Sequence, residues 1–508
     1  MLARAHTFTI EGLEARFVTV EVDIRVGLPS FTIVGLADAA VREARDRVRA
    51  AILNSGFDFP ARRITANLAP GDIRKVGAGL DLALACAVLA ASDQISSERL
   101  EGFAFFGELS LDGEVRSCQG TLAVAQASAG AGLHTLVLGP ERACEATLVD
   151  ALKIGVAERL SSAVRILTEG TGDPLPSSAS SEESIDEREP DLSDVRGQHQ
   201  AVKAMIIAAA GGHNSLLSGP PGTGKTMLAQ RMPSILPPLS RSEAIEVTRI
   251  HSITGKLERN GLMTRRPFRA PHHTATTAGL IGGAGTGWVG EIVLAHNGVL
   301  FLDELSEFSR QSLEALRQPL EDGRVAIVRA NHAAVYPARF MLVAATNPCP
   351  CGFAGVAERC HCSEAELARY RRKLSGPLLD RIDMLTHLER QKTHNLTEEP
   401  LTSSTQAREA VLLARERQLA RFANDGIVAN THMDPRMLRL HVNLDDKSDA
   451  MLRSAHERGL LSARGQHRTL RVARTVADLA GSDHVAPQHV AMALSLRPEA
   501  SLAGTRAA

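Results

Sequence analysis

Gly219-Pro220-Pro221-Gly222-Thr223-Gly224-Lys225-Thr226 is the stretch that decides the fold of this chain. It fits G-x-x-x-x-G-K-[ST] at each fixed position; an apolar run precedes it and a helix-forming run follows it. A strand, a glycine turn and a helix N-terminus bring backbone N–H groups together around phosphates. Lys225 would reach the β- and γ-phosphates, and the hydroxyl of Thr226 would hold Mg²⁺. The flanking runs argue against a chance match, so the stretch predicts a site for a nucleoside triphosphate and Mg²⁺.

The composition limits what the chain can be. At 508 residues it is long enough for about three domains. The net charge of -1 gives no overall nucleic-acid footprint, so contact with DNA would require a local basic patch or a pore. Aromatic residues make up only 3% of the chain, which argues against base-stacking platforms. Neither a long apolar run nor a signal-peptide-like block occurs, so we expect a cytoplasmic protein without membrane contact.

Residues 1–168 alternate between strand-like and helix-like runs, which predicts a first domain of the α/β or α+β class. Within it, Gly107–Arg116 is typical of a β-hairpin closed by Asp-Gly. Residues 169–190 are rich in serine, proline and acid, so we expect a flexible linker there. The strand-like runs are Phe17–Val22, Phe31–Val34, Arg63–Leu68, Phe103–Phe106 and Thr135–Leu138, and the helix-like runs are Ala37–Leu53, Leu80–Ala91 and Gly120–Ala129.

Two further apolar runs end in polar residues. Val299–Leu302 precedes Asp303 and Glu304, and Phe340–Thr346 precedes Asn347. Buried parallel strands deliver such side chains at their C-terminal ends. In a nucleotide site Asp303 would hold Mg²⁺ through water, and Glu304 would polarise the attacking water. From its position alone, Asn347 could be an ordinary strand-end cap.

Four of the seven cysteines are clustered as Cys349-Pro350-Cys351 and, after eight intervening residues, Cys360-His361-Cys362. Two C-x-C pairs suit a tetrahedral site of four thiolates, and a structural Zn²⁺ is the expected occupant. A reducing compartment favours a metal over disulfides, although a disulfide or free thiols remain as alternatives. The other three, Cys86, Cys118 and Cys144, are scattered and are expected to be small core residues.

Together these motifs resemble the AAA+ ATPases of the Mg-chelatase type. The run Asn347–Gly352, which reads Asn-Pro-Cys-Pro-Cys-Gly, resembles the YifB/ComM family among them most specifically. The resemblance implies a multidomain α/β protein in which Asn347 would be sensor 1, the residue that orients the attacking water against the γ-phosphate. A Lon-protease-like domain of ribosomal S5 type would occupy residues 1–168, a linker residues 169–190, the AAA+ P-loop core residues 191–395, and a helical lid residues 396–508.

The first domain lacks the residues of a Lon-type protease. The segment that matches the serine-bearing stretch of such a protease is Lys75–Gly79, which contains no serine. No lysine stands near Gly120–Val124, where the activating lysine is expected. Because a Ser–Lys dyad needs both partners, we expect a non-catalytic domain that serves assembly, substrate contact or regulation.

The resemblance also implies roles for two arginines. Arg381 lies in Leu378-Leu379-Asp380-Arg381-Ile382-Asp383, which resembles the L-L-D-R-[FI]-D segment of these ATPases. There it would be an arginine finger that reaches the γ-phosphate of a neighbouring subunit. Arg464 would be sensor 2 of the helical lid. The alternatives are an ion pair with Asp380 or Asp383 for Arg381, and Arg468 or Arg471 as the true sensor.

Three segments are candidates for contact with a substrate. Leu239–Glu291 resembles the helix-2 insert that projects toward the channel of the ring, and Arg324–Ala338 resembles the pre-sensor-1 hairpin. Arg369–Lys373 is the densest basic run, either a phosphate-contact patch or a solvated helix face. His272 and His273 suggest a metal, but no acid or cysteine stands near them in the sequence.

The family resemblance implies a homo-hexameric ATPase motor that acts on single-stranded and branched DNA. It would promote branch migration during natural transformation or homologous recombination. The main alternative is a chelatase-type motor subunit that remodels a protein partner without DNA. The integral first domain, the cysteine cluster and the lack of an adjacent metal-ion-dependent adhesion motif argue against that alternative. The missing serine and lysine argue against a Lon-like protease.

Overall fold

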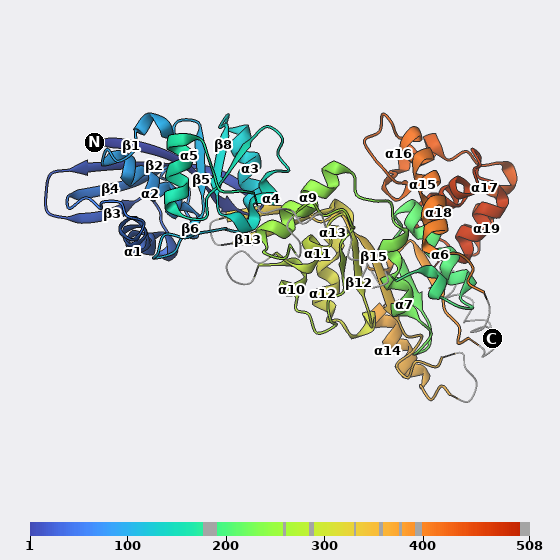
Figure 1. The fold of residues 1–508 in the computed structure, drawn as a ribbon. Helices are drawn as coiled ribbons and strands as arrows, with labels where there is room; N and C mark the ends of the chain where they lie inside the picture. The colour runs from blue at the N-terminus through green and yellow to red at the C-terminus, as the bar shows by residue number, and fades with distance from the viewer. Residues whose placement is uncertain are drawn as a thin grey trace. The chain divides into compact units, whose positions relative to one another are not determined.

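The computed structural model describes residues 1–175, 190–257, 261–283, 289–329, 332–354, 359–374, 378–391 and 399–497. The chain forms two compact units (Figure 1). The first consists of Met1–Ser184 and Arg241–Met263, and the second of Ile185–Ser240 and Thr264–Ala508. Most of the predicted linker lies outside the described residues. Among the described helices, none combines the length and apolar character needed to span a bilayer.

The first unit is built on a seven-stranded mixed sheet in the order β3-β4-β2-β1-β5-β8-β9. The long strands β1 and β2 are antiparallel over their whole length, and β5, β8 and β9 run parallel to one another. The predicted strands and the short hairpin β6–β7 are confirmed, whereas β1 and β9 were not predicted. The bounds are β1 Leu2–Glu11, β2 Glu14–Arg25, β3 Ser30–Val34, β4 Arg63–Ala69, β5 Phe103–Phe106, β6 Glu108–Leu109, β7 Val115–Arg116, β8 Thr135–Leu138 and β9 Lys153–Val156.

Helices cover both faces of this sheet. Side chains alternate between the two faces along each strand, so a strand contributes to a core on either side. Along β5, Phe105 joins one core while Ala104 and Phe106 join the other. The first core takes in α1 (Ala39–Asn54), α2 (Asp81–Ala91) and α5 (Leu160–Glu169), and the second takes in α3 (Thr121–Gly130) and α4 (Ala143–Ala146). Every residue of α2 is buried, which confirms the predicted core helix. The carboxylate of Asp81 lies 2.7 Å from the guanidinium of Arg47 on α1.

One helix of the first unit lies, in the sequence, between the phosphate-loop motif and Asp303. Helix α9, Arg241–Ile253, buries Ala244, Val247 and Ile250. Ser252 accepts a 3.3 Å hydrogen bond from the N–H of Gly120, and its hydroxyl donates to the buried carboxylate of Glu145 on α4. The predicted insert Leu239–Glu291 is therefore not one structural piece. Its first part folds with the first unit because α9 has an apolar face to bury there.

The second unit contains a five-stranded parallel sheet in the order β11-β12-β15-β10-β16. The apolar runs expected to be buried strands are confirmed: each residue of β10, β12 and β15 is buried. Helix α6, His199–Gly211, packs on this sheet beside α7 (Lys225–Gln230) and α8 (Met232–Ile235). The strand bounds are β10 Ser215–Ser218, β11 Phe268–Arg269, β12 Val299–Leu302, β15 Met341–Thr346 and β16 Met384–His387.

Smaller elements of the second unit lie between β11 and β16 in the sequence. Strands β13, Arg324–Arg329, and β14, His332–Pro337, form a separate two-stranded antiparallel sheet, which confirms the predicted hairpin. The helices of this region are α10 Thr277–Ile281, α11 Glu291–Leu294, α12 Arg310–Ala315, α13 Arg317–Asp322 and α14 Glu364–Leu374.

The C-terminal part of the second unit is helical, as predicted. Its elements gather around α6 and share its core (Figure 1). Asp478 on α18 is fully buried, and it accepts hydrogen bonds from Arg421, Arg474 and Asn430. The helices are α15 Ser404–Arg421, α16 Pro435–His441, α17 Asp446–Glu457, α18 Ala463–Leu479 and α19 Pro487–Ser495.

We predict that Asp478→Ala destabilises the C-terminal helices by about 3–5 kcal/mol, because it leaves buried guanidinium groups without their carboxylate. Asp446→Ala, on the exposed first turn of α17, is the matched control and should cost about 0.5 kcal/mol. Urea unfolding of the full chain, followed by far-ultraviolet circular dichroism, measures both. Equal midpoints for the two variants would refute a stabilising role for this network.

Candidate functional site

The nucleotide motifs converge at one edge of the parallel sheet of the second unit. Strand β15 lies between β12 and β10, and the pairs Ser218↔Thr346 and Leu302↔Ala344 keep the C-terminal ends of these strands nearly level. The phosphate-loop motif follows β10, Asp303 and Glu304 follow β12, and Asn347 follows β15. This edge is where open α/β sheets bind their ligands.

The glycine turn after β10 has the conformation that a phosphate cradle needs. Gly222 and Gly224 have φ values of 76° and 87°, in the left-handed region. Apart from each glycine and its two chain neighbours, no described atom lies within 4 Å of where a Cβ would stand, so the backbone is open for a ligand to approach. Helix α7 begins directly behind, at Lys225. These residues therefore fit the phosphates of a nucleotide. The full predicted set is Gly219, Pro220, Pro221, Gly222, Thr223, Gly224, Lys225 and Thr226.

The amine of Lys225 connects the turn to Asn347. Its Nζ donates hydrogen bonds to the carbonyls of Gly219 at 2.7 Å and Pro220 at 3.0 Å, and to Oδ1 of Asn347 at 3.1 Å. Burial lowers the pKa of Lys225, an effect that the carboxylates of Asp303 and Glu304 oppose. Phosphate oxygens are stronger acceptors for this ammonium group than neutral carbonyls are, so a bound nucleotide can replace these contacts.

Thr226 and Asp303 stand together as a magnesium site requires. The hydroxyl of Thr226 donates to Oδ2 of Asp303 at 2.6 Å, and the N–H of Glu304 donates to Oδ1 of the same carboxylate at 2.9 Å. Mg²⁺ prefers hard oxygen ligands and usually keeps several waters besides substrate phosphates. The two residues predicted to share the ion are thus adjacent, although they stand 77 positions apart in the sequence.

Glu304 has a partner that the sequence did not reveal. Its backbone is left-handed, with φ 49° and ψ 50°, and a non-glycine residue in that region is strained. Its Oε2 lies 3.1 Å from Nδ1 of His273, whose ring is 4.1 Å from that of His272. His273 follows β11, the neighbour of β12 in the sheet. The sequence pointed to these histidines only as metal candidates; their position after a strand of the same sheet was the signal available.

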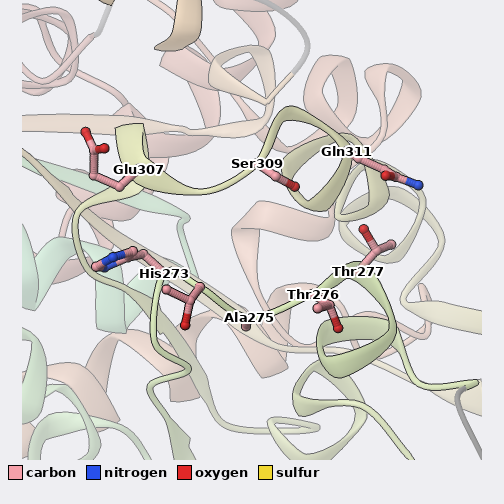
Figure 2. Close-up of a pocket in the computed structure, with 8 residues that line it drawn as sticks. His273, Ala275, Thr276, Thr277, Glu307, Ser309 and Gln311 are labelled. Carbon is pink, nitrogen blue, oxygen red and sulfur yellow. The ribbon is translucent and has the colours of Figure 1, made fainter.

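A cavity of about 400 Å³ opens beside His273. Figure 2 shows two segments facing each other across it, one from His273 to Thr277 and the other from Glu307 to Gln311. Thr276 and Thr277 carry hydroxyl groups on the first segment, and Ser309 carries one on the second. His273 therefore stands between this hydroxyl-rich cavity and the carboxylate of Glu304. The complete lining is His273, Thr274, Ala275, Thr276, Thr277, Glu307, Ser309 and Gln311.

Two neighbouring side chains hold the nucleotide motifs in place. Gln198, at the start of α6, donates to the carbonyl of Thr223 at 3.2 Å and to that of Glu389 at 2.9 Å. Tyr370, on α14, donates its hydroxyl hydrogen to the carbonyl of Asn347 at 2.8 Å, and its oxygen lies 3.1 Å from Oγ1 of Thr346. Sequence reasoning counted Tyr370 only as part of a basic run and missed this contact.

The two arginines with predicted roles, Arg381 and Arg464, have different surroundings. Arg381, in the 3₁₀ turn η6 (Leu379–Arg381), pairs with Glu321 at the end of α13, rather than with Asp380 or Asp383. Arg464 is exposed on the first turn of α18. The two alternatives to it face inward: Arg468 lies 3.8 Å from the buried Asp383, and burial lowers the pKa of both Arg468 and Arg471. Of these three arginines, Arg464 is therefore the one with an exposed side chain.

The four clustered cysteines lie close enough to share one ion. Their sulfur atoms all stand within 4.8 Å of one another, and the Sγ of Cys349 is 3.3 Å from that of Cys351 and 3.9 Å from that of Cys360. Zn–S bonds of about 2.3 Å in a tetrahedron separate the sulfurs by roughly 3.8 Å. The donor set, completed by Cys362, fits zinc, and all four residues are free thiols.

Comparison with known proteins agrees with this geometry. Three family models match the chain. Residues 20–142 match subunit ChlI of Mg-chelatase, residues 191–396 match magnesium chelatase, subunit ChlI, and residues 401–497 match the C-terminal model of the same subunit. The chain is 41% identical over 502 residues to the competence protein ComM of Haemophilus influenzae and to YifB of Escherichia coli, covering 98% of this chain and 97% of each relative. An uncharacterised protein of Mycobacterium tuberculosis is 45% identical over 498 residues, covering 98% of both chains.

The matches cover the nucleotide motifs, the cysteine cluster and both flanking parts of the chain. With a parallel sheet that brings the two nucleotide motifs together, and with full-length identity above 40% to two named relatives, the assignment is plain. The chain belongs to the YifB/ComM family of Mg-chelatase-like AAA ATPases.

Proposed function

We propose that the protein is an ATP-hydrolysing ring motor that acts on DNA and promotes branch migration during natural transformation or homologous recombination. The observation that carries the enzymatic part is the assembly of Lys225, Thr226, Asp303 and Asn347 at one sheet edge. Full-length similarity to a relative named as a competence protein supports the DNA part. The second candidate is a chelatase-type motor that remodels a protein partner, which the match to the chelatase models favours.

The hydrolysis step follows from what each side chain can do. Bound Mg²⁺ would neutralise charge on the β- and γ-phosphates. Lys225 would leave the carbonyls of Gly219 and Pro220 for phosphate oxygens while staying near Asn347. Glu304 would polarise the attacking water, and for this its carboxylate must be released from His273.

Arg381 would complete the site from a neighbouring subunit. In this chain its guanidinium pairs with Glu321, whose side chain is 56% exposed. The side chain of Arg381 is only 9% exposed, so exchanging this carboxylate for a developing phosphate charge requires the guanidinium to become accessible to a neighbouring subunit. A finger supplied in trans would make hydrolysis depend on a closed ring, for which we propose a homo-hexamer.

Two features of the second unit support contact with DNA. The β13–β14 hairpin is a sheet of its own, with Arg324 and Val335 exposed. Helix α14 carries the basic run that begins at Arg369, and phosphate contacts by such groups supply most sequence-independent affinity. The side chains of Arg329, His332, Arg371 and Arg372 lie outside the described residues.

The direct experiment compares ATP hydrolysis without DNA and with single-stranded, duplex and branched DNA, and then follows migration of a three-stranded joint. We expect DNA to stimulate hydrolysis and the joint to migrate only with ATP. A hexamer that hydrolyses ATP but binds no DNA would favour the protein-remodelling candidate.

Two substitutions separate nucleotide binding from turnover. Lys225→Ala should lower ATP affinity and abolish hydrolysis, because it removes the cation that faces the phosphates. Glu304→Gln should leave binding intact and lower kcat by about 10²-fold or more, because an amide cannot activate water. Binding of a fluorescent ATP analogue and steady-state hydrolysis measure these effects. Normal turnover in Glu304→Gln would show that another residue activates the water.

Mixing two inactive variants tests the trans arginine. Arg381→Ala and Lys225→Ala should each be inactive alone, yet mixed rings should recover part of the hydrolysis, because an intact pocket can meet an intact finger. Native mass spectrometry confirms that rings are mixed. Mixed rings without any recovery would contradict a role of Arg381 in trans.

The contact between His273 and Glu304 predicts a restrained basal state. His273→Ala should raise hydrolysis in the absence of DNA by about fivefold, because a partly exposed polar contact of this kind contributes up to about 1 kcal/mol. His272→Ala, which leaves that contact in place, is the control. A loss of turnover in His273→Ala alone would instead mean that His273 positions Glu304 for catalysis.

A further inference from the structure

The loop that carries the four cysteines begins and ends against the nucleotide site. Cys349 follows Asn347 by two residues, and Oδ1 of Asn347 accepts a hydrogen bond from Lys225. Cys349 is fully buried, and its Sγ accepts a hydrogen bond from the N–H of Ala354 at 3.1 Å. The first pair of thiols is therefore attached to the strand end that holds Asn347.

The turn inside the first pair touches the phosphate loop. The N–H of Gly352 donates to the carbonyl of Cys349 at 3.0 Å, which closes a tight turn around Cys351. Gly352 has φ +85°, and a Cβ on it would lie 2.7 Å from Cδ of Pro221 and 2.9 Å from its Cγ. Only glycine allows this close approach. The cysteine turn and the phosphate loop are thus in direct contact.

The second pair is connected to the same strand end by α14. Cys360 and Cys362 directly precede this helix, which begins at Glu364. Tyr370 on it is only 6% exposed, and its hydroxyl bonds the carbonyl of Asn347 and lies 3.1 Å from Oγ1 of Thr346. An ion held by both pairs would therefore fix two segments that each contact the nucleotide site.

We propose that Cys349, Cys351, Cys360 and Cys362 form a structural zinc site whose occupancy is coupled to nucleotide binding through Gly352 and Tyr370. Four thiolates in a tetrahedron are a closed structural set for Zn²⁺, which supplies no redox chemistry here. Zinc holds Asn347 and Pro221 in the arrangement that receives phosphate. Because coupling between two ligands is reciprocal, bound nucleotide tightens zinc by the same factor by which zinc tightens nucleotide.

The coupling distinguishes this site from a metal site that merely supports folding. The proposed coupling rests on the nucleotide site of the ATPase core and not on any action on DNA. A failed DNA assay would therefore not refute it. Two variants address the connections and keep all four thiols: Gly352→Ala, whose methyl group would collide with Pro221, and Tyr370→Phe, which removes one hydroxyl. Cys144→Ser, outside the cluster, is the control for a lost thiol.

The experiment uses the purified full chain. Elemental analysis should find one zinc per chain in the wild type and in Cys144→Ser, and less than half in Cys351→Ser. Removal of zinc by a chelator should raise the Kd for a fluorescent ATP analogue about tenfold, and added Zn²⁺ should restore it. A non-hydrolysable ATP analogue should slow zinc release about tenfold in the wild type. Gly352→Ala and Tyr370→Phe should keep their zinc and lose most of that effect.

Several results would overturn the proposal. A chain without metal, iron in place of zinc, or a mass that shows a disulfide within the cluster would each refute the zinc assignment. Zinc at full occupancy with equal nucleotide affinity in the loaded and stripped chains would refute the coupling. The same slowing of zinc release in Gly352→Ala and Tyr370→Phe as in the wild type would refute the connections named here.

Discussion

The parallel pairing of β12, β15 and β10 is the constraint on which the rest of the site depends. Each strand is buried throughout, so its polar residues can stand only where the strand ends. Because the strands are parallel and nearly level, those ends meet at one edge. Asp303 and Asn347 directly follow their strands there, and the phosphate loop brings Lys225 from the end of β10 to the same place. The left-handed turn at Glu304 and the positive-φ glycines of the phosphate loop are local consequences of leaving the strands at that edge.

We propose that contacts beyond the motifs control the site as well as build it. His273 holds the carboxylate of Glu304, while Gly352 and Tyr370 connect the cysteine loop to the phosphate loop and to Asn347. Each contact joins residues far apart in sequence, and each involves a group that a bound triphosphate would disturb. In this proposal, separate segments restrain the carboxylate of Glu304 and support the phosphate loop.

Sequence reasoning succeeded where one local pattern decides the structure. Continuous apolar runs predicted β10, β12 and β15, and beyond the ends of these strands Thr226 and Asp303 lie 2.6 Å apart; that these two residues share an ion stays a prediction. It failed where tertiary packing decides. β1 carries polar residues at many positions and is defined by its pairing with β2, and α9 joins the first unit through contacts such as that of Ser252 with Glu145, 107 positions away. The thiol separations, which the sequence left open, fit a shared ion rather than a disulfide.

A structure of the chain with a non-hydrolysable ATP analogue and Mg²⁺ tests the central claim most directly. The account predicts the ion between the phosphates, the hydroxyl of Thr226 and the carboxylate of Asp303, with Nζ of Lys225 moved from the carbonyls of Gly219 and Pro220 to phosphate oxygens. A nucleotide bound away from this sheet edge, or a Lys225 still held by those carbonyls beside a bound triphosphate, would contradict it.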